Sequence, residues 1–196
     1  MSTFEVEIKF RVNDRAELER QLQQRFGHSE FRKPVTESDS FFQHPCRNFV
    51  ETDECLRLRK RTISEGTSEH FLTYKGPKID PQTKTRQEIE MLITEPERWE
   101  TLLVALGFHK SASVQKLRRR LELTIEQRHV EITLDMLPDL PESNRLFLEI
   151  ETLATEEEVE VCRSLILGLA AQLGLSEPIR HSYLHLVQNE CGENRV

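Results

Sequence analysis

The sequence has no apolar run near the roughly 18 residues that a membrane-spanning helix requires. It shows no signal peptide, so we expect a soluble, cytoplasmic protein with no membrane partner. The four cysteines, Cys46, Cys55, Cys162 and Cys191, show no C-x-x-C spacing. This pattern argues against a zinc site or a disulfide framework and favours reduced thiols.

Basic residues are fewer than acidic residues. The chain has 27 Lys and Arg against 34 Asp and Glu, which gives a formal net charge of -7. General nucleic-acid binding depends on a basic surface, so we expect no nucleic-acid partner. A local cationic pocket for a small anion is still compatible with this charge.

Hydrophobic residues make up only 37% of the chain, while charged residues make up 31%. Such a composition can indicate disorder. Here, however, the apolar residues recur periodically, which indicates a folded protein. The 196 residues contain no internal repeat and no linker, so we expect a single domain over residues 1–190 and a polar tail over 191–196.

Residues 4–12 alternate without a break between apolar and charged side chains, which predicts a strand with one apolar and one charged face. Further strands are predicted at 36–43, 55–61, 71–75, 86–91, 113–123, 129–135 and 147–151. Many short strands separated by turn signals predict a closed or nearly closed antiparallel β-barrel.

Four segments have helical periodicity, at residues 14–26, 94–106, 155–173 and 181–188. Asn13 or Asp14 can cap the first helix, Thr94 can cap the second, and Thr155 begins a capping box for the third. The predicted fold is therefore α+β, a closed eight-stranded antiparallel barrel with helices packed outside.

The predicted strands carry many charged residues at alternating positions. The acids are Glu5, Glu7, Glu88, Glu90, Asp135, Glu149 and Glu151, and the bases are Lys9, Arg57, Arg59, Lys75, Arg86, Lys116 and Arg118. If the apolar faces turn outward toward the helices, these charges point into the barrel. Burying these side chains without partners would be very unfavourable, but a polyanion would neutralise the basic ones and a divalent metal ion the acidic ones.

Carboxylates spaced two apart on a strand offer the hard oxygen ligands that Mg²⁺ and Mn²⁺ prefer, and three E-x-E pairs have this spacing. Lysine and arginine suit phosphate oxygens. The alternative interpretation is that these are ordinary solvated strand faces with cross-strand ion pairs.

In this order, the charged motifs resemble the CYTH family of class IV adenylate cyclases and thiamine triphosphatases, also called triphosphate tunnel metalloenzymes. The motifs are E-x-E-x-K at 5–9, L-R-L-R at 56–59, Y-K-G at 74–76, R-x-E-x-E at 86–90, K-x-R at 116–118 and E-x-E at 149–151. The resemblance covers residues 4–187. It implies an eight-stranded tunnel that binds a triphosphate and Mg²⁺ or Mn²⁺.

The resemblance also implies roles for individual residues. The implied triphosphate-binding residues are Lys9, Arg57, Arg59, Lys75, Arg86, Lys116 and Arg118. The implied metal ligands, or holders of metal-bound water, are Glu5, Glu7, Glu88, Glu90, Asp135, Glu149 and Glu151. Glu5, Glu7 and Lys9 are the implied catalytic residues.

Two segments depart from the family pattern. Relatives often place a basic residue directly before a C-terminal Ser-Tyr, where this chain has His181 preceded by Arg180. The segment 138–141, with a proline at each end, replaces a Gly-Phe-type turn. His181 and His185 have the spacing of a helical zinc pair, but with no third ligand nearby a surface pair is the simpler interpretation.

The tunnel charges would serve two reactions equally. Hydrolysis of the terminal phosphate needs only the tunnel, so we place a triphosphatase acting on tripolyphosphate, thiamine triphosphate or ATP first. A class IV adenylate cyclase, which converts ATP to cyclic AMP and pyrophosphate and also needs a held nucleoside, is the alternative. A non-catalytic polyphosphate- or nucleotide-binding module is a further one. A homodimer is compatible with the sequence, but no motif indicates it.

Overall fold

The computed structural model of the protein describes residues 4–27, 30–64, 66–79 and 83–193. In these ranges the strands are β1 (Phe4–Arg11), β2 (Val35–Gln43), β3 (Cys55–Ser64), β4 (Thr67–Lys75), β5 (Arg86–Ile93), β6 (His109–Ile125), β7 (Arg128–Met136) and β8 (Leu146–Ala154). The helices are α1 (Arg15–Phe26), α2 (Pro96–Ala105), α3 (Val159–Gln172) and α4 (Tyr183–Glu193), with 3-10 turns at Glu142–Asn144 and Glu156–Glu158. No helix within the described ranges is both long and apolar enough to cross a membrane.

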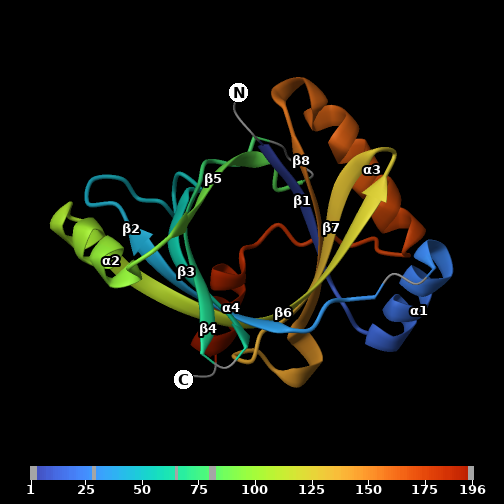
Figure 1. Ribbon diagram of the computed structural model, residues 1–196, viewed down its shortest axis with the longest axis horizontal. Helices are drawn as coiled ribbons and strands as arrows, with labels where there is room; N and C mark the ends of the chain where they lie inside the picture. Colours follow the sequence, from blue (N-terminus) through green and yellow to red (C-terminus); the bar gives the residue numbers. More distant parts are fainter. Residues whose placement is uncertain (1–3, 28–29, 65, 80–82, 194–196) are drawn as a thin grey trace.

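The strands form one closed antiparallel barrel in the order β1-β5-β4-β3-β2-β6-β7-β8, and β8 pairs back onto β1 (Figure 1). The prediction of an eight-stranded antiparallel barrel with outer helices is confirmed. Within the described ranges the contact between β1 and β5 is short, with Phe4 opposite Gln87 and Glu5 opposite Arg86. The backbone N–H of Lys84 extends this seam by donating to the carbonyl of Glu7 at 2.9 Å.

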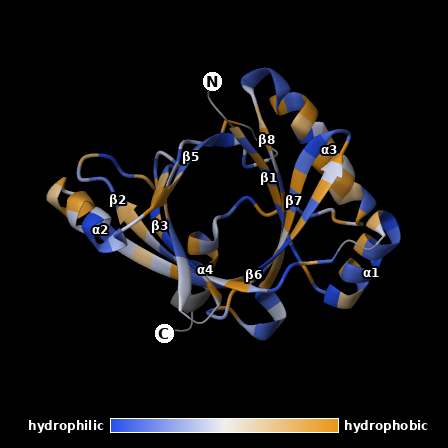
Figure 2. Cartoon of the chain, in the orientation of Figure 1, coloured by the Kyte–Doolittle hydropathy of each residue, from blue (hydrophilic) through white to orange (hydrophobic). Residues whose placement is uncertain are grey.

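The register determines which side chains share the lumen, because residues directly opposite each other on paired strands point to the same face. Glu7 lies opposite Glu151, and Lys9 lies opposite Glu149. Hydrophilic and hydrophobic bands alternate along the strands (Figure 2). The structure therefore places the charged face of the strands inside the barrel and the apolar face outside.

The apolar outer face is covered by helices on two flanks of the barrel (Figure 1). On one flank, Val6 and Ile150 of β1 and β8 are buried in a cluster with Leu22 of α1 and Ile166 of α3. On the other flank, α2 contributes Leu103 to a second cluster over β2, β3 and β4. The helices thus supply the hydrophobic core that a barrel with a charged interior cannot have inside.

Some element boundaries differ from the predictions. Strand β6 has 17 residues and extends beyond 113–123 at both ends. The prediction that Thr94 caps the second helix is wrong, because Glu95 occupies the N-cap position with φ 53° and makes no side-chain cap hydrogen bond. Proline lacks an N–H and has a fixed φ, so it suits the first helical position, and Pro96 there sets the cap one residue after Thr94.

The C-terminal region also differs in detail. The predicted capping box at Thr155 is present, but the first turn is 3-10 and regular helix begins at Val159. Helix α4 runs to Glu193, so the first residues of the predicted 191–196 tail are helical, while 194–196 lie outside the described residues. The division into one domain and a tail stays a prediction.

The outer core can be tested with two isoleucines on outward strand positions. Ile150 is fully buried, whereas Ile89 on β5 is 47% exposed. We expect Ile150→Ala to lower the free energy of unfolding by about 2–5 kcal/mol, since it leaves a cavity. Ile89→Ala should change it by about 0.5 kcal/mol. Urea unfolding measures both, and similar losses in the two variants would contradict this account of the core.

Candidate functional site

The barrel encloses a cavity of about 810 Å³, within the usual size range of small-molecule sites. Of the site residues predicted from the sequence, those that line it are Glu5, Glu7, Lys9, Arg57, Arg59, Lys75, Arg86, Glu88, Glu90, Lys116, Arg118, Glu149 and Glu151. Asp135 is fully buried behind the lining and bonds to Arg118 and Lys116. The cavity therefore joins charges from strands far apart in the sequence.

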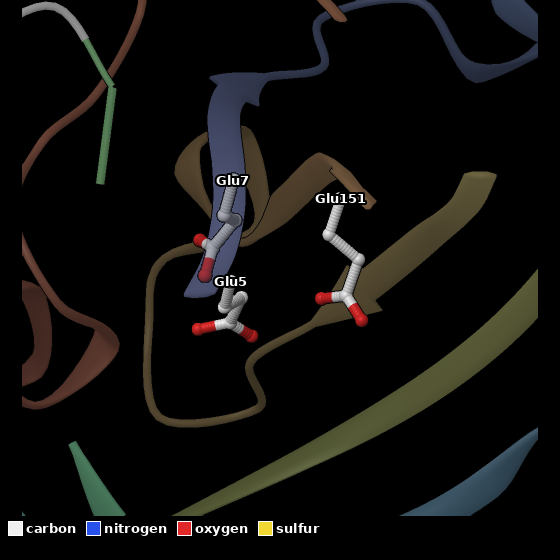
Figure 3. Close-up of side chains that lie close together, drawn as sticks. All are labelled: Glu5, Glu7 and Glu151. Atoms are coloured by element: carbon white, nitrogen blue, oxygen red, sulfur yellow. The ribbon is translucent and has the colours of Figure 1, made fainter. Parts of the chain in front are cut away.

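Three carboxylates gather on adjacent strands at one side of the cavity. Glu5 and Glu7 project from β1 and Glu151 projects from β8 toward them (Figure 3). Each has a carboxylate oxygen within 4.8 Å of the oxygens of the other two. Among the described residues this is the one group of three or more acidic, histidine or cysteine side chains close enough to hold a metal ion.

The electrostatics of this cluster favour a cation. Burial raises the pKa of Glu151 well above its usual range, and the nearby Glu5 and Glu131 raise it further. Burial also raises the pKa of Glu5, although the ammonium group of Lys75 opposes this shift. Repelling carboxylates in a desolvated site are stabilised by an added positive charge. The all-oxygen donor set fits a hard divalent cation such as Mg²⁺ or Mn²⁺.

The other predicted metal ligands lie among cations instead. Glu149 accepts a hydrogen bond from Arg118 at 2.6 Å and lies 3.6 Å from both Lys9 and Lys84. Burial alone would raise the pKa of Glu149, but these cations together hold it well below its usual range. Asp135 receives two hydrogen bonds from Arg118 at 2.5 and 2.7 Å. These two acids are therefore already neutralised by protein side chains.

Glu88 of β5 lies beside Glu5, with which it shares the ammonium group of Lys75, and Glu90 follows on the same strand. Glu88 forms an ion pair with Lys75 at 2.7 Å. Glu90 accepts a hydrogen bond from Thr73 at 2.9 Å and lies 3.9 Å from Arg57. The structure does not bring these two residues into the group formed by Glu5, Glu7 and Glu151.

Two buried acids of β2 hold cationic side chains of the cavity lining in place, and sequence reasoning missed both. Asp39 receives two hydrogen bonds from Arg59 at 2.7 and 2.8 Å. Glu37 lies 3.0 Å from Arg59 and 3.4 Å from Lys116. Burial would raise the pKa of Asp39, but Arg59 and Arg57 hold it well below its usual range. The alternation within residues 36–43 carried this signal, since it places both acids on one strand face.

Arg86 differs from the other cations of the lining. It is buried, with 9% of its surface exposed, yet it makes no ion pair or side-chain hydrogen bond with the described residues. Its Nε is buried and has no hydrogen-bond partner there. An unpaired buried guanidinium is unfavourable in the free protein. An anion in the cavity would remove that cost.

Lys84 is a further lining residue that sequence reasoning missed. Its Nζ donates to the carboxylate of Glu7 at 2.5 Å. Burial lowers the pKa of Lys9 well below its usual range, and the neighbouring Lys84 lowers it further. Lys84 lies two positions before Arg86, so extending the alternation of β5 by one step would have found it.

The C-terminal segment reaches the cavity through Tyr183. The Nζ of Lys9 lies 3.8 Å from the centroid of the Tyr183 ring. His181 and His185 line the mouth of the cavity, and their rings stack at 4.3 Å with an interplanar angle of 6°. Within the described part of the chain no third ligand joins this pair, so a zinc site there is not supported.

Comparison with known proteins gives consistent matches along the chain. The family model described as CYTH domain matches residues 3–183. A Methanocaldococcus jannaschii protein named "Putative adenylate cyclase MJ0240" is 33% identical over 185 residues, which are 93% of this chain and 97% of that protein.

Two solved structures from Pyrococcus horikoshii OT3 have the same fold. The PH1819 protein is 37% identical with a TM-score of 0.80, over 94% of this chain and 98% of that one. The PH1012 protein is 26% identical with a TM-score of 0.71, over 93% of this chain and 98% of that one.

The raised pKa values of Glu5 and Glu151 predict a linked effect of pH and metal on stability. A carboxyl whose pKa is higher in the folded than in the unfolded state destabilises the metal-free fold increasingly as pH rises through that interval. A bound divalent cation removes this penalty. We therefore expect Mg²⁺ or Mn²⁺ to raise the Tm, and to raise it more at pH 8 than at pH 6, in thermal unfolding followed by circular dichroism.

Two variants separate this effect from a general effect of charge. Glu151→Gln should raise the Tm of the metal-free protein at pH 8 and reduce the Tm increase caused by metal. Glu142→Gln, whose side chain is 88% exposed, should behave like the wild type. The idea fails if the Tm increase caused by metal is the same at both pH values and in all three proteins.

Proposed function

The chain belongs to the CYTH family, and from this membership we propose that it is a divalent-metal-dependent enzyme that hydrolyses the terminal phosphate of a triphosphate bound inside the barrel. The observation that carries the proposal is that one buried cavity holds both a carboxylate cluster and several cationic side chains, among them Arg86, which has no ion pair with the residues that the structure describes. A triphosphate with a divalent cation matches both halves of this arrangement in charge and in ligand chemistry.

In this proposal the cationic side chains bind and orient the phosphates. Arg86 and Arg57 of β5 and β3 contact phosphate oxygens, and their planar guanidinium groups can do so bidentately. Lys9 adds an ammonium group from β1. These groups neutralise negative charge where it is greatest and fix the direction in which the chain of phosphates lies, which is the main task in phosphoryl transfer.

Glu5, Glu7 and Glu151 would hold the metal. When bound, Mg²⁺ or Mn²⁺ would supply Lewis acidity and neutralise phosphate charge. Because burial raises the pKa values of Glu5 and Glu151, a bound cation would favour the charged forms of these two carboxylates. Lys84, which pairs with Glu7 in the free protein, keeps that carboxylate in place in the absence of metal. The closed barrel wall limits the water that reaches the phosphates, which strengthens each of these interactions.

Adenylate cyclisation is a second candidate, favoured by the name of the relative from Methanocaldococcus jannaschii. In that reaction the 3′-hydroxyl of ATP attacks the α-phosphorus and pyrophosphate leaves. The same cations and carboxylates would serve it. Cyclisation additionally requires that the nucleoside be held with its ribose at the α-phosphate, whereas hydrolysis requires only the charged lumen. We therefore place hydrolysis first.

A product assay tests the two reactions. The purified protein is incubated with Mg²⁺ or Mn²⁺ and, separately, with tripolyphosphate, thiamine triphosphate or ATP. We expect orthophosphate without cyclic AMP, together with the diphosphate product. Cyclic AMP in amounts equal to pyrophosphate would instead make the protein a cyclase. Binding of all three compounds without any product would mean a non-catalytic binding module.

Arg86 allows a sharper test of the triphosphate site. We expect Arg86→Gln to lower kcat/KM for the best triphosphate about 10–100-fold, because a charge-assisted contact worth about 1.5–3 kcal/mol is lost. The Tm should stay equal or rise, since the variant removes an unpaired buried charge. Arg119→Gln is the control, because Arg119 pairs with Glu19 of α1. Equal kcat/KM in Arg86→Gln and wild type would remove Arg86 from the site.

A further inference from the structure

Tyr183 is the first residue of α4, which lies across the lower part of the barrel ring in Figure 1 (red). Its ring contacts three residues from the barrel. The ammonium nitrogens of Lys9 and Lys116 lie 3.8 and 5.1 Å from the ring centroid. The ring of Phe147 meets it edge-on, with centroids 5.4 Å apart and an interplanar angle of 66°. Tyr183 therefore forms part of the cavity lining.

The position of this ring is fixed by the packing of the C-terminal segment. Ile179 anchors the segment by donating its backbone N–H to the carbonyl of Lys9 at 2.7 Å. Leu184 and Val187 of α4 pack against a buried apolar cluster that includes Leu137 and Phe147. Tyr183 is thus held in place before any ligand arrives, so its side chain loses little conformational freedom when a ligand binds.

The hydroxyl group of Tyr183 is unusual. Its oxygen is buried, yet it has no hydrogen-bond partner among the described residues. A buried hydroxyl without a partner is unfavourable and calls for an explanation. The two neighbouring ammonium groups can only donate, so a ligand atom beside them and the hydroxyl must be an acceptor, and an anionic oxygen suits it best.

The nearby acids do not meet this need. Asp135 is already bonded by Arg118 and Lys116, and Glu149 is bonded by Arg118. Neither is a hydrogen-bond partner of the Tyr183 hydroxyl. A phosphate oxygen of a bound ligand would supply the missing acceptor.

We propose that Tyr183 is a substrate-binding residue whose hydroxyl donates a hydrogen bond to a phosphate oxygen, while its ring holds the ammonium groups of Lys9 and Lys116 beside the same phosphate. This inference rests on the proposed function, since it takes the ligand to be a triphosphate. It adds a binding contact from outside the barrel strands. The ring and the hydroxyl have separate tasks, and substitutions can separate them.

The test measures affinity and stability in the same variants. Calorimetric titration with inorganic tripolyphosphate in EDTA reports binding without turnover, steady-state kinetics with Mg²⁺ report KM, and thermal unfolding reports Tm. Tyr183→Phe should weaken tripolyphosphate binding about tenfold and raise KM similarly. Its Tm should be equal to or above that of the wild type, because a buried unpartnered hydroxyl is removed. Tyr183→Leu, which also removes the ring, should bind more weakly still.

Tyr74 is the matched control, since it is the other tyrosine of the chain. Its hydroxyl donates to Glu54 at 2.5 Å, and its ring packs against the apolar cluster beneath α2 and does not line the cavity. Tyr74→Phe should therefore lower the Tm and leave tripolyphosphate affinity unchanged, which is the reverse of Tyr183→Phe.

Each result separates this inference from the proposed function. If the wild type does not bind tripolyphosphate, the proposed function itself is wrong. If the wild type binds it and Tyr183→Phe binds within twofold of the wild type, the role of Tyr183 is wrong and the function stands. A Tm for Tyr183→Phe below that of the wild type would show a structural hydrogen bond and would likewise overturn the role.

Discussion

The fold depends on how charged side chains are kept inside a closed barrel. Taking an ion out of water is unfavourable unless a partner of opposite sign and enough hydrogen bonds replace the water. Most charges in this lumen meet that condition with protein partners, as Arg59 does with Asp39 and Arg118 with Asp135. The exceptions among the described residues are the carboxylate of Glu151, which lies close to Glu5 and Glu7, and the guanidinium group of Arg86, which has no ion pair. They are where a ligand lowers the energy of the folded protein most.

Because charged side chains line the interior of the barrel, the hydrophobic core has to lie on its outer face. The apolar faces of the strands cannot pack against one another across the lumen, as they do in small barrels filled by hydrophobic side chains. They need helices, and α1, α2 and α3 provide the buried partners. This arrangement accounts for a hydrophobic content of only 37% in a chain that still buries a core. Segments that look too polar for a core are the ones whose charged face points inward.

Alternation along each strand is a local signal, so the sequence alone predicts the strands and their charged faces well. It cannot predict which strands meet, because pairing depends on contacts between distant parts of the chain. Glu149 and Glu151 show the difference. They share one strand face, yet register places Glu149 opposite Lys9 and Glu151 opposite Glu7. The first is neutralised by cations and the second joins the carboxylate cluster, which no spacing rule distinguishes.

The ion pairs that each arginine makes in the free protein indicate whether it holds acids in position or is available to bind phosphate. A guanidinium that already contacts several carboxylates gains little from another anion, because the new contact displaces an existing one. Arg118 contacts Asp135, Glu149 and Glu37, so we expect it chiefly to hold acids in position. With the described residues, Arg57 makes only looser contacts, at 3.5 Å or more, and Arg86 makes no ion pair. Among the arginines, those of β5 and β3 should therefore contribute most of the free energy of phosphate binding, although the sequence motifs treat all of them alike.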